Sequence, residues 1–407
     1  MEREDGNRRF AESYTCAELE RFGCASGGFW KGSARNVQIF RIPVPAFGCY
    51  RVEAEVCARE DGEILLFGNR RRLFAKRVLR AGECFTKAFL ILLTESPVSE
   101  KELGEEPAVF VSLAGPAELS GASVRAVYED ERVPIVFAAG DSTMTDQEAD
   151  LANLSSGLYH TAGVYCGWGE MFSCFFSEAA VFSNHARSGR TTLSFREEGH
   201  YAIVRQYLKP GDFFLIQFGH NDQKLAELDS FGGYRRELER YAREIQEAGA
   251  FPILATPVGR NIWKQDGTYA DLLWHHADAV RDLGEKMDLP VLDLHRITTE
   301  RIRREGEAKT SLYLYPGDRT HANDYGGYRI ASEAASALKA LLEKRSEEAY
   351  RRLAACICPP VSEEAWEPDP SREQELIRKS KELAGDGSDF QKALERGDGE
   401  LYAFLTR

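Results

Sequence analysis

Two patterns of hydrophobic and polar residues divide the chain. Over residues 36–127, alternating or β-branched runs such as YRVEAEV, EILLFG and FTKAFLILL are separated by charged turns that contain glycine. Such runs are typical of strands with one buried face, so this part of the chain predicts an all-β module. From Pro134 onward, short apolar runs alternate with longer segments of helical period, beginning with PIVFAAG. This alternation favours a parallel sheet flanked by helices.

The second pattern is regular enough to predict individual elements. We expect strands over residues 180–184, 213–218, 252–256 and 290–294, and helices over 233–247, 269–286 and 324–343. After about Lys344 the chain becomes rich in charge, and the proline-interrupted segment CICPPVSEEAWEPDP precedes two short helical stretches. We therefore expect a β-domain over residues 1–132, an α/β domain over 133–345 and a helical C-terminal extension over 346–407.

Length, charge and hydropathy exclude several classes of protein. The 407 residues, 43% of them hydrophobic, suffice for more than one core. A net charge of -13 provides no broad positive field for nucleic acid or anionic lipid, so we expect neither as a partner. Positive residues at 70–72 and 76–80 are interpreted as a solvated strand face rather than a basic binding patch. The longest apolar runs are too short to span a bilayer.

The start of the chain and its cysteines bear on location and cofactors. The polar start MEREDGNRRFAESYTC has no apolar core typical of a signal peptide, so we expect a cytoplasmic protein. Nine cysteines form no framework pattern and need not be paired, which fits a reducing compartment. Cys356 and Cys358 lack the spacing of a zinc or redox pair, and neighbouring His275 and His276 point in different directions in the predicted helix. We expect no metal and no cofactor.

A serine follows the first predicted strand of the α/β pattern. Gly140, Asp141, Ser142 and Thr143 come directly after the apolar run, which puts Ser142 at the edge where open α/β sheets bind ligands. Gly140 permits a tight exit from the strand, so Ser142 can project with its own amide facing a developing oxyanion. Asp141 is better placed to brace this turn than to act as the acid of a triad. The same residues also fit a simple strand-to-helix cap.

Two further polar blocks carry candidate residues, and the first of them is predicted at the same edge. His220 and Asn221 follow the apolar run FFLIQ, and the Asn221 amide can be aimed at a substrate oxygen. Asp318 precedes His321 by three residues in a loop before the last long helix, so its carboxylate can accept the imidazole Nδ1 proton and leave Nε2 for the serine proton. His220 is an alternative base, and Asp318 with His321 also fits a helix cap. The three blocks together favour a serine hydrolase.

Five ordered blocks resemble the SGNH/GDSL hydrolases of the rhamnogalacturonan acetylesterase family. They are GDSTM at 140–144, GWG at 167–169, NHA followed by SG at 184–189, FGHND at 218–222 and DxTH at 318–321. The resemblance spans about residues 133–342. It implies a flavodoxin-like three-layer α/β/α SGNH hydrolase domain, preceded by an all-β sandwich that we expect to be galactose-binding-like. The region after Lys344 departs from the family pattern.

The resemblance also implies a role for each matching residue. Ser142 becomes the nucleophile and His321 the base, with Asp318 orienting His321. Ser142, Gly189 and Asn221 become the oxyanion hole. The implied reaction is deacetylation of pectin-derived rhamnogalacturonan oligosaccharides through an acyl-enzyme, which is a step of pectin degradation. Gly189 also fits a simple turn.

The sequence also suggests substrate contacts and rival functions. Trp168 and His220 are candidate substrate contacts, although Trp168 fits a core position equally well. One alternative is an SGNH esterase that acts on another acylated glycan, such as xylan, or on a lipid ester. An alternative of another class is a non-catalytic carbohydrate-binding protein, which the complete set of signature residues disfavours. The sequence leaves the oligomeric state open.

Overall fold

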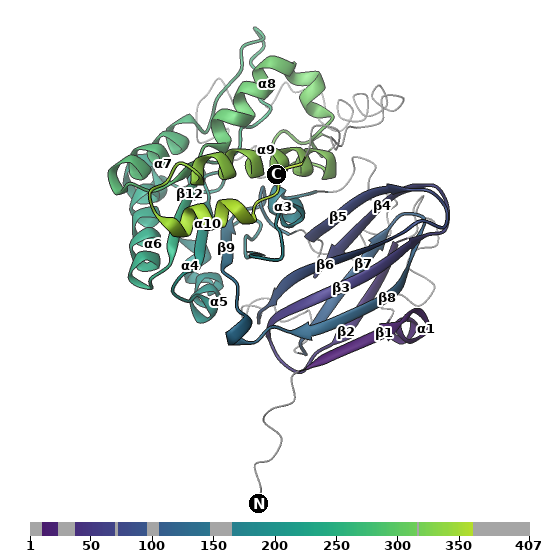
Figure 1. The fold of residues 1–407 in the computed structure, drawn as a ribbon. Helices are drawn as coiled ribbons and strands as arrows, with labels where there is room; N and C mark the ends of the chain where they lie inside the picture. Colours follow the sequence, from purple (N-terminus) through teal and green to yellow (C-terminus); the bar gives the residue numbers. More distant parts are fainter. Residues whose placement is uncertain are drawn as a thin grey trace, which may run out of the picture.

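The computed structural model has a β-rich N-terminal part that leads into a parallel α/β part (Figure 1). The structure describes residues 10–22, 37–69, 72–95, 106–146, 165–315 and 317–360. The two short helices predicted near the C-terminus, and residues 70 and 71 of the predicted positive run, lie outside the described residues. Within these residues no helix has the length and apolar character needed to cross a membrane.

The N-terminal part contains two four-stranded antiparallel sheets in the described residues, with the orders β1-β8-β3-β6 and β2-β7-β4-β5. The strands are β1 (Ala11–Thr15), β2 (Val37–Pro43), β3 (Gly48–Ala58), β4 (Gly62–Gly68), β5 (Arg72–Leu79), β6 (Cys84–Leu93), β7 (Ala108–Ala114) and β8 (Ala117–Ala126). A short helix, α1 (Cys16–Leu19), follows β1. Strand β1 was not predicted, because its five residues are mostly polar and exposed.

The two sheets share one apolar core. Along β3, Val52, Ala54 and Val56 are fully buried at every second position, as expected for a strand with one inward face. They belong to the same cluster as Leu66 of β4 and Val111 of β7, which come from the other sheet. Cys57 and Cys84 form a disulfide that joins β3 to β6. The cysteine spacing gives no sign of this pair, because only the strand register brings the two residues together.

The α/β part is built on a five-stranded parallel sheet with the order β10-β9-β11-β12-β13. The strands are β9 (Ile135–Gly140), β10 (Val181–Asn184), β11 (Phe213–Gln217), β12 (Phe251–Ala255) and β13 (Val291–Leu292). Numbered along the chain, this order is 2-1-3-4-5, the flavodoxin-like order that the resemblance implied. All residues of β9 and β11 are buried, which explains their uninterrupted apolar runs. The predicted strands are present, and the last is shorter than expected.

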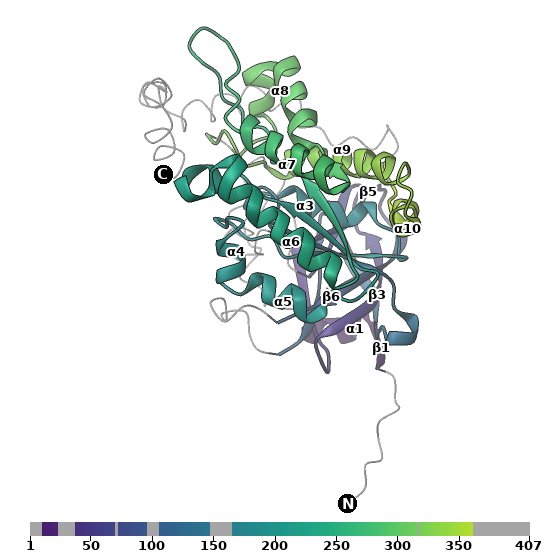
Figure 2. The same ribbon diagram turned by 90° about the vertical axis from the view of Figure 1, so that its left-hand side faces the viewer.

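Helices cover both faces of the parallel sheet (Figures 1 and 2). One face packs against α3 (Trp168–Phe172), α8 (Leu294–Ser311), α9 (Asp324–Leu342) and α10 (Glu348–Cys356). The other face packs against α4 (Ser194–Glu197), α5 (His200–Tyr207), α6 (Arg235–Glu247) and α7 (Trp274–Met287). Helix α7 begins later than predicted, because residue 269 pairs with Trp263 in an isolated β-bridge. Helix α8 was not predicted, and Gly306, with φ 79°, interrupts its helical geometry.

The described part of the C-terminal extension packs onto the α/β part. Leu353 and Ile357 lie in the same apolar cluster as Leu338 and Leu342 of α9. The hydroxyl of Tyr350 donates a hydrogen bond to the carbonyl oxygen of Pro252 in β12 at 2.8 Å. Residues 346–360 are therefore a packed layer over the sheet.

The two parts of the chain are joined by a continuous core. Leu65, Phe67 and Leu73 from the N-terminal sheets share a cluster with Trp168 and Phe172 of α3. Arg72, the first residue of β5, is buried among them, so the interpretation of residues 70–72 as a solvated strand face is wrong at this position. The reason is an ion pair across the junction, described below. Arg77, farther along β5, is exposed as expected.

Candidate active site

Three loops meet at the candidate site, and two of them leave the carboxyl edge of the parallel sheet directly after β9 and β11. Ser142 lies in the turn after β9, where the amides of Met144 and Thr145 both donate to the carbonyl oxygen of Asp141 at 3.1 Å. Asn221 lies just after β11, next to β9 in the sheet. His321 lies in the loop before α9. Strands β9 and β11 flank the point at which the strand order reverses, the usual ligand site of such sheets.

The predicted triad residues form a continuous chain of hydrogen bonds. His321 Nε2 lies 2.8 Å from Ser142 Oγ, and His321 Nδ1 lies 2.8 Å from Asp318 Oδ2. Because a carboxylate can only accept, Nδ1 carries the ring proton and Nε2 is free to take the serine proton. Burial alone would raise the pKa of Asp318, but the hydrogen bond and charge of His321 outweigh it and lower this pKa. Asp318 therefore stays a carboxylate.

Hydrogen bonds between the Asp318 side chain and the main chain of the same loop stabilise the loop that carries His321. Asp318 Oδ1 accepts hydrogen bonds from the amides of Thr320 at 2.6 Å and His321 at 2.9 Å. Helix α9 is capped by Asn323, whose side-chain oxygen accepts from the Gly326 amide at 3.0 Å. The alternative in which Asp318 and His321 cap this helix is therefore wrong.

Arg260 ties the base loop to the loop after β11, and sequence reasoning missed it. Its guanidinium donates to the Thr320 hydroxyl through Nη1 and to the carbonyl oxygen of His220 through Nη2, the latter at 3.2 Å. The neighbouring Asn261 amide donates to the carbonyl oxygen of Arg319 at 2.8 Å. Arg260 is buried. Its position after a strand end, like that of the other blocks, is the signal by which it could have been found.

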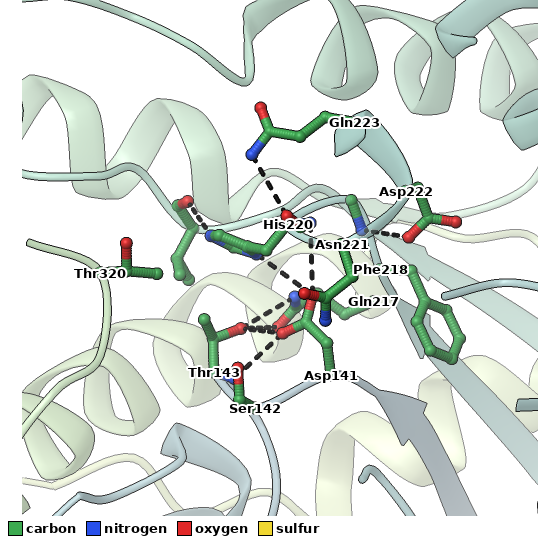
Figure 3. Close-up of polar contacts among 12 residues, drawn as sticks. Asp141, Ser142, Thr143, Gln217, Phe218, His220, Asn221, Asp222, Gln223 and Thr320 are labelled. Atoms are coloured by element: carbon green, nitrogen blue, oxygen red, sulfur yellow. Dashed lines mark hydrogen bonds and ion pairs between the residues drawn. The ribbon is translucent and has the colours of Figure 1, made fainter. Parts of the chain in front are cut away.

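Asp141 braces the nucleophile turn, as predicted. Its Oδ1 accepts from the amide and hydroxyl of Thr143 at 3.0 and 2.8 Å, and its Oδ2 lies 3.2 Å from His220 Nδ1 (Figure 3). Burial would raise the pKa of this carboxyl, but the charge and hydrogen bond of His220 and the bonds from Thr143 lower the pKa to about 2. Asp141 is therefore a buried carboxylate whose hydrogen bonds come from Thr143 in the same turn and from His220 in the loop after β11.

The structure corrects the substrate-contact roles predicted for His220 and Trp168. His220 is only 2% exposed, and its Nε2 lies 3.0 Å from the carbonyl oxygen of Val258, so both ring nitrogens are engaged inside the protein. Trp168 is fully buried, and its indole nitrogen donates to Gln217 Oε1 at 2.8 Å. Neither ring offers a face to a sugar. His220 is also too occupied to be the alternative base.

The side chain of Asn221 is held at both ends. Its Nδ2 donates to the carbonyl oxygen of Arg190 at 3.1 Å, and Lys224 Nζ donates to its Oδ1 at 2.9 Å. An ammonium group can only donate, so Lys224 determines which end of the amide is oxygen. The bond to the Arg190 carbonyl oxygen uses one of the two amide hydrogens. Lys224 was not singled out from the sequence.

The predicted glycine of the oxyanion hole lies in the loop that Asn221 contacts. Gly189 is exposed and has φ 79°, a left-handed conformation that favours glycine. Asp222 binds this loop to the end of β11: its Oδ1 accepts from the amide and hydroxyl of Thr192 at 2.8 and 2.6 Å, and its Oδ2 from the Gly219 amide at 3.1 Å. Burial raises the pKa of Asp222 to about 7. The loop carrying Gly189 is thus tied to the block carrying Asn221.

The β-rich part reaches the nucleophile turn through Arg72. Its Nε donates to Asp146 Oδ2 at 2.5 Å, and its Nη2 donates to the carbonyl oxygen of Asn184 at 2.8 Å. Asn184 in turn donates to the carbonyl oxygen of Met144 and to Asp146 Oδ1, both at 2.7 Å. This network is buried and connects the ends of β9 and β10 to β5. No sequence pattern pointed to it.

Metal ligation has no candidate among the residues that the structure describes. Within them, no group of three or more His, Cys, Asp or Glu side chains is arranged to hold a metal ion.

Comparisons with known proteins point to one family. The model of the GDSL-like Lipase/Acylhydrolase family matches residues 138–330. The chain is 31% identical over 222 residues to the rhamnogalacturonan acetylesterase RhgT of Bacillus subtilis, covering 51% of this chain and 90% of that protein. It is 24% identical to a rhamnogalacturonan acetylesterase of Emericella nidulans, covering 48% and 81%. The crystal structure of the Bacillus subtilis protein YXIM is 21% identical with a TM-score of 0.48, covering 75% of this chain and 80% of that one.

Proposed function

Because this chain belongs to the GDSL-like (SGNH) hydrolases of the rhamnogalacturonan acetylesterase type and is a carboxylic ester hydrolase, we propose that it deacetylates pectin-derived rhamnogalacturonan oligosaccharides. The hydrogen-bond chain from Ser142 through His321 to Asp318 carries the proposed chemistry. The substrate class rests on the names of the relatives. Fold alone does not determine it.

The proposed reaction begins with proton transfer from Ser142 to His321. Ser142 Oγ attacks the acetyl carbonyl carbon while His321 Nε2 takes its proton, and the carbonyl oxygen becomes an oxyanion. His321 then gives this proton to the leaving sugar oxygen, and the acetyl group stays on Ser142. Water attacks the acetyl-enzyme with His321 again as the base, which releases acetate and restores Ser142. Asp318 keeps the imidazole in the required tautomer throughout.

The oxyanion is proposed to bind three donors. These are the main-chain amides of Ser142 and Gly189 and the second Nδ2 hydrogen of Asn221. The contacts from Asn221 to Arg190 and from Asp222 to Thr192 support this assignment, because they hold the donors before the substrate arrives. Donors that are already oriented lose no energy to reorganisation when the charge develops.

The proposed domains follow the fold. Residues 1–132 form the β-sandwich domain of galactose-binding-like type, residues 133–345 the hydrolase domain and residues 346–407 the C-terminal extension. The shared core of the two N-terminal sheets supports the first assignment, and the five-stranded parallel sheet supports the second.

The test is acetate release from a panel of esters by the purified chain, with Ser142→Ala as the matched control. The panel contains acetylated rhamnogalacturonan oligosaccharides, acetylated xylan and 4-nitrophenyl acetate. We expect the highest kcat/KM on the rhamnogalacturonan fragments and background rates from the control. Preference for xylan would refute the substrate class and leave the serine mechanism intact. Equal rates from the wild type and the control on every ester would refute the mechanism as well.

A further inference from the structure

Tyr165 occupies a fixed position beside the proposed base. The next residue, Cys166, forms an isolated antiparallel bridge with Ala322, and its amide donates to the Ala322 carbonyl oxygen at 2.9 Å. Gly167 lies so close to the nucleophile turn that a Cβ on it would meet the Thr145 carbonyl oxygen at 2.2 Å. The main chain at Cys166 and Gly167 therefore lies between the loop that carries the proposed base and the turn that carries Ser142.

The ring of Tyr165 is in contact with two other rings. Its centroid lies 5.3 Å from that of His321, edge to face at 89°. It also stacks on Tyr315 with centroids 3.9 Å apart and an interplanar angle of 11°. Both arrangements are favourable geometries for aromatic pairs. They restrict the rotation of the Tyr165 side chain and hold it next to the reacting centre.

Tyr165 is exposed although its neighbours in the sequence are buried. Its side chain is 39% exposed, whereas Cys166 and Trp168 are at most 1% exposed. A large aromatic residue that is fixed in place and still faces solvent is typical of a binding surface, because it contributes contact area at a small cost in side-chain entropy. Burial, followed by the charge of Asp318, raises the pKa of Tyr165 to about 12, so its hydroxyl stays neutral and can donate to a sugar oxygen.

We propose that Tyr165, supported by Tyr315, is a sugar-binding platform on which a pyranose ring of the substrate stacks beside the scissile ester. This inference rests on the proposed function, because it assigns a subsite to the same carbohydrate esterase. The apolar C–H face of a pyranose is electropositive relative to the face of an aromatic ring, so the two attract. Tyr165 takes the sugar-stacking role that the sequence had suggested for Trp168. Trp168 itself is buried in the core.

The test separates sugar binding from support of the base. Tyr165→Ala, Tyr165→Phe and Tyr165→Trp are assayed on an acetylated oligosaccharide and on 4-nitrophenyl acetate, which has no pyranose ring. We expect Tyr165→Ala to raise KM for the oligosaccharide about 5- to 30-fold. Its oligosaccharide-to-aryl ratio of kcat/KM should fall at least about fivefold. The two aromatic variants should keep most of this ratio. Trp274→Ala is the matched control, because Trp274 is 46% exposed on α7 and should leave both activities unchanged.

A second measurement detects sugar binding without acyl chemistry. A deacetylated oligosaccharide is used as a competitive inhibitor of 4-nitrophenyl acetate hydrolysis, and we expect its inhibition constant to rise with KM in Tyr165→Ala. Equal losses on both esters with an unchanged inhibition constant would overturn the platform and make Tyr165 a support of His321. Normal kinetics on both esters would overturn it too. If the wild type prefers another acetylated glycan, the proposed substrate fails, and the same ratio measured on that glycan still tests the platform.

Discussion

At the scale of single residues, each reacting group has its orientation determined by a neighbour. Asp318 selects the tautomer of His321, and Lys224 selects the orientation of the Asn221 amide. The first relation was predicted from the three-residue spacing, because a loop that short brings the carboxylate to Nδ1. The second was not, because a lysine near a polar block is indistinguishable from a solvated surface residue until its partner is known.

Replacing Ser142 tests its proposed role as the nucleophile. Ser142→Ala removes the hydroxyl oxygen proposed to form the acetyl-enzyme, so we expect kcat on any acetate ester to fall by about 10³-fold or more. The thermal midpoint should move by no more than a few degrees, because a half-buried hydroxyl is not a core contact. Steady-state rates and a melting curve on the same preparation are the measurements. A folded variant with near-normal turnover would exclude Ser142 as the nucleophile.

Variants of Asn221 and Lys224 should lower kcat to different extents. Asn221→Ala removes a donor to charge that develops only at the tetrahedral stage, so kcat should fall about 10²- to 10³-fold with little change in KM. Lys224→Met keeps the Asn221 side chain but removes the hydrogen bond to its Oδ1. We expect a smaller loss of about 10-fold, again in kcat. Lys209→Met, which breaks an exposed ion pair with Glu129, is the control. A rise in KM with unchanged kcat would mean that the pair binds substrate instead.

At the scale of elements, strand ends were the most predictable feature. The runs IVFAAG and FFLIQ are buried along their whole length, so their ends, and the polar blocks that follow, could be located from hydrophobicity alone. Helix α7 was predicted to begin too early, because residues 269–273 are apolar enough to extend its pattern while their main chain is engaged elsewhere. Buried polar contacts, such as Asp222 with Thr192, depend on loop geometry that no periodicity encodes.

The nucleophile turn should show its dependence on Asp141 as a pH effect on stability. The pKa of about 2 in the folded protein lies below the ordinary aspartate pKa of 3.8, so the carboxylate stabilises the fold above pH 4 to 5, and this contribution is lost as the pH falls through 2. The shift corresponds to about 2 kcal/mol. Asp141→Asn should therefore melt lower than the wild type at pH 7, and the difference should shrink between pH 5 and pH 2. A difference in melting temperature between Asp141→Asn and the wild type that stays constant over this range would contradict an ionised Asp141 in the folded protein.

At the scale of the whole molecule, the two parts of the chain are one structural unit. Sequence patterns separated a β-rich part from an α/β part, because the period of hydrophobic residues changes near Pro134. They could not reveal the buried junction. In the sequence, Arg72 cannot be distinguished from a solvated charge on a strand, and its partner Asp146 is distant in sequence. The ends of β9 and β10, which position Ser142 and the Gly189 loop, are thus supported by a side chain from β5.

Breaking the buried Arg72–Asp146 ion pair tests this junction. Arg72→Met leaves the Asp146 charge buried without its partner, which typically costs about 3–5 kcal/mol, so we expect a clear fall in the thermal midpoint and in kcat. The double variant Arg72→Met/Asp146→Asn removes both charges and should recover part of the loss, because no unpaired charge remains. Arg51→Met is the matched control, since the Arg51–Glu178 pair also crosses the junction but is partly exposed, and its loss should cost less than about 1 kcal/mol. Purely additive losses in the double variant, or an Arg72→Met midpoint equal to that of Arg51→Met, would mean that the buried pair does not couple the two parts.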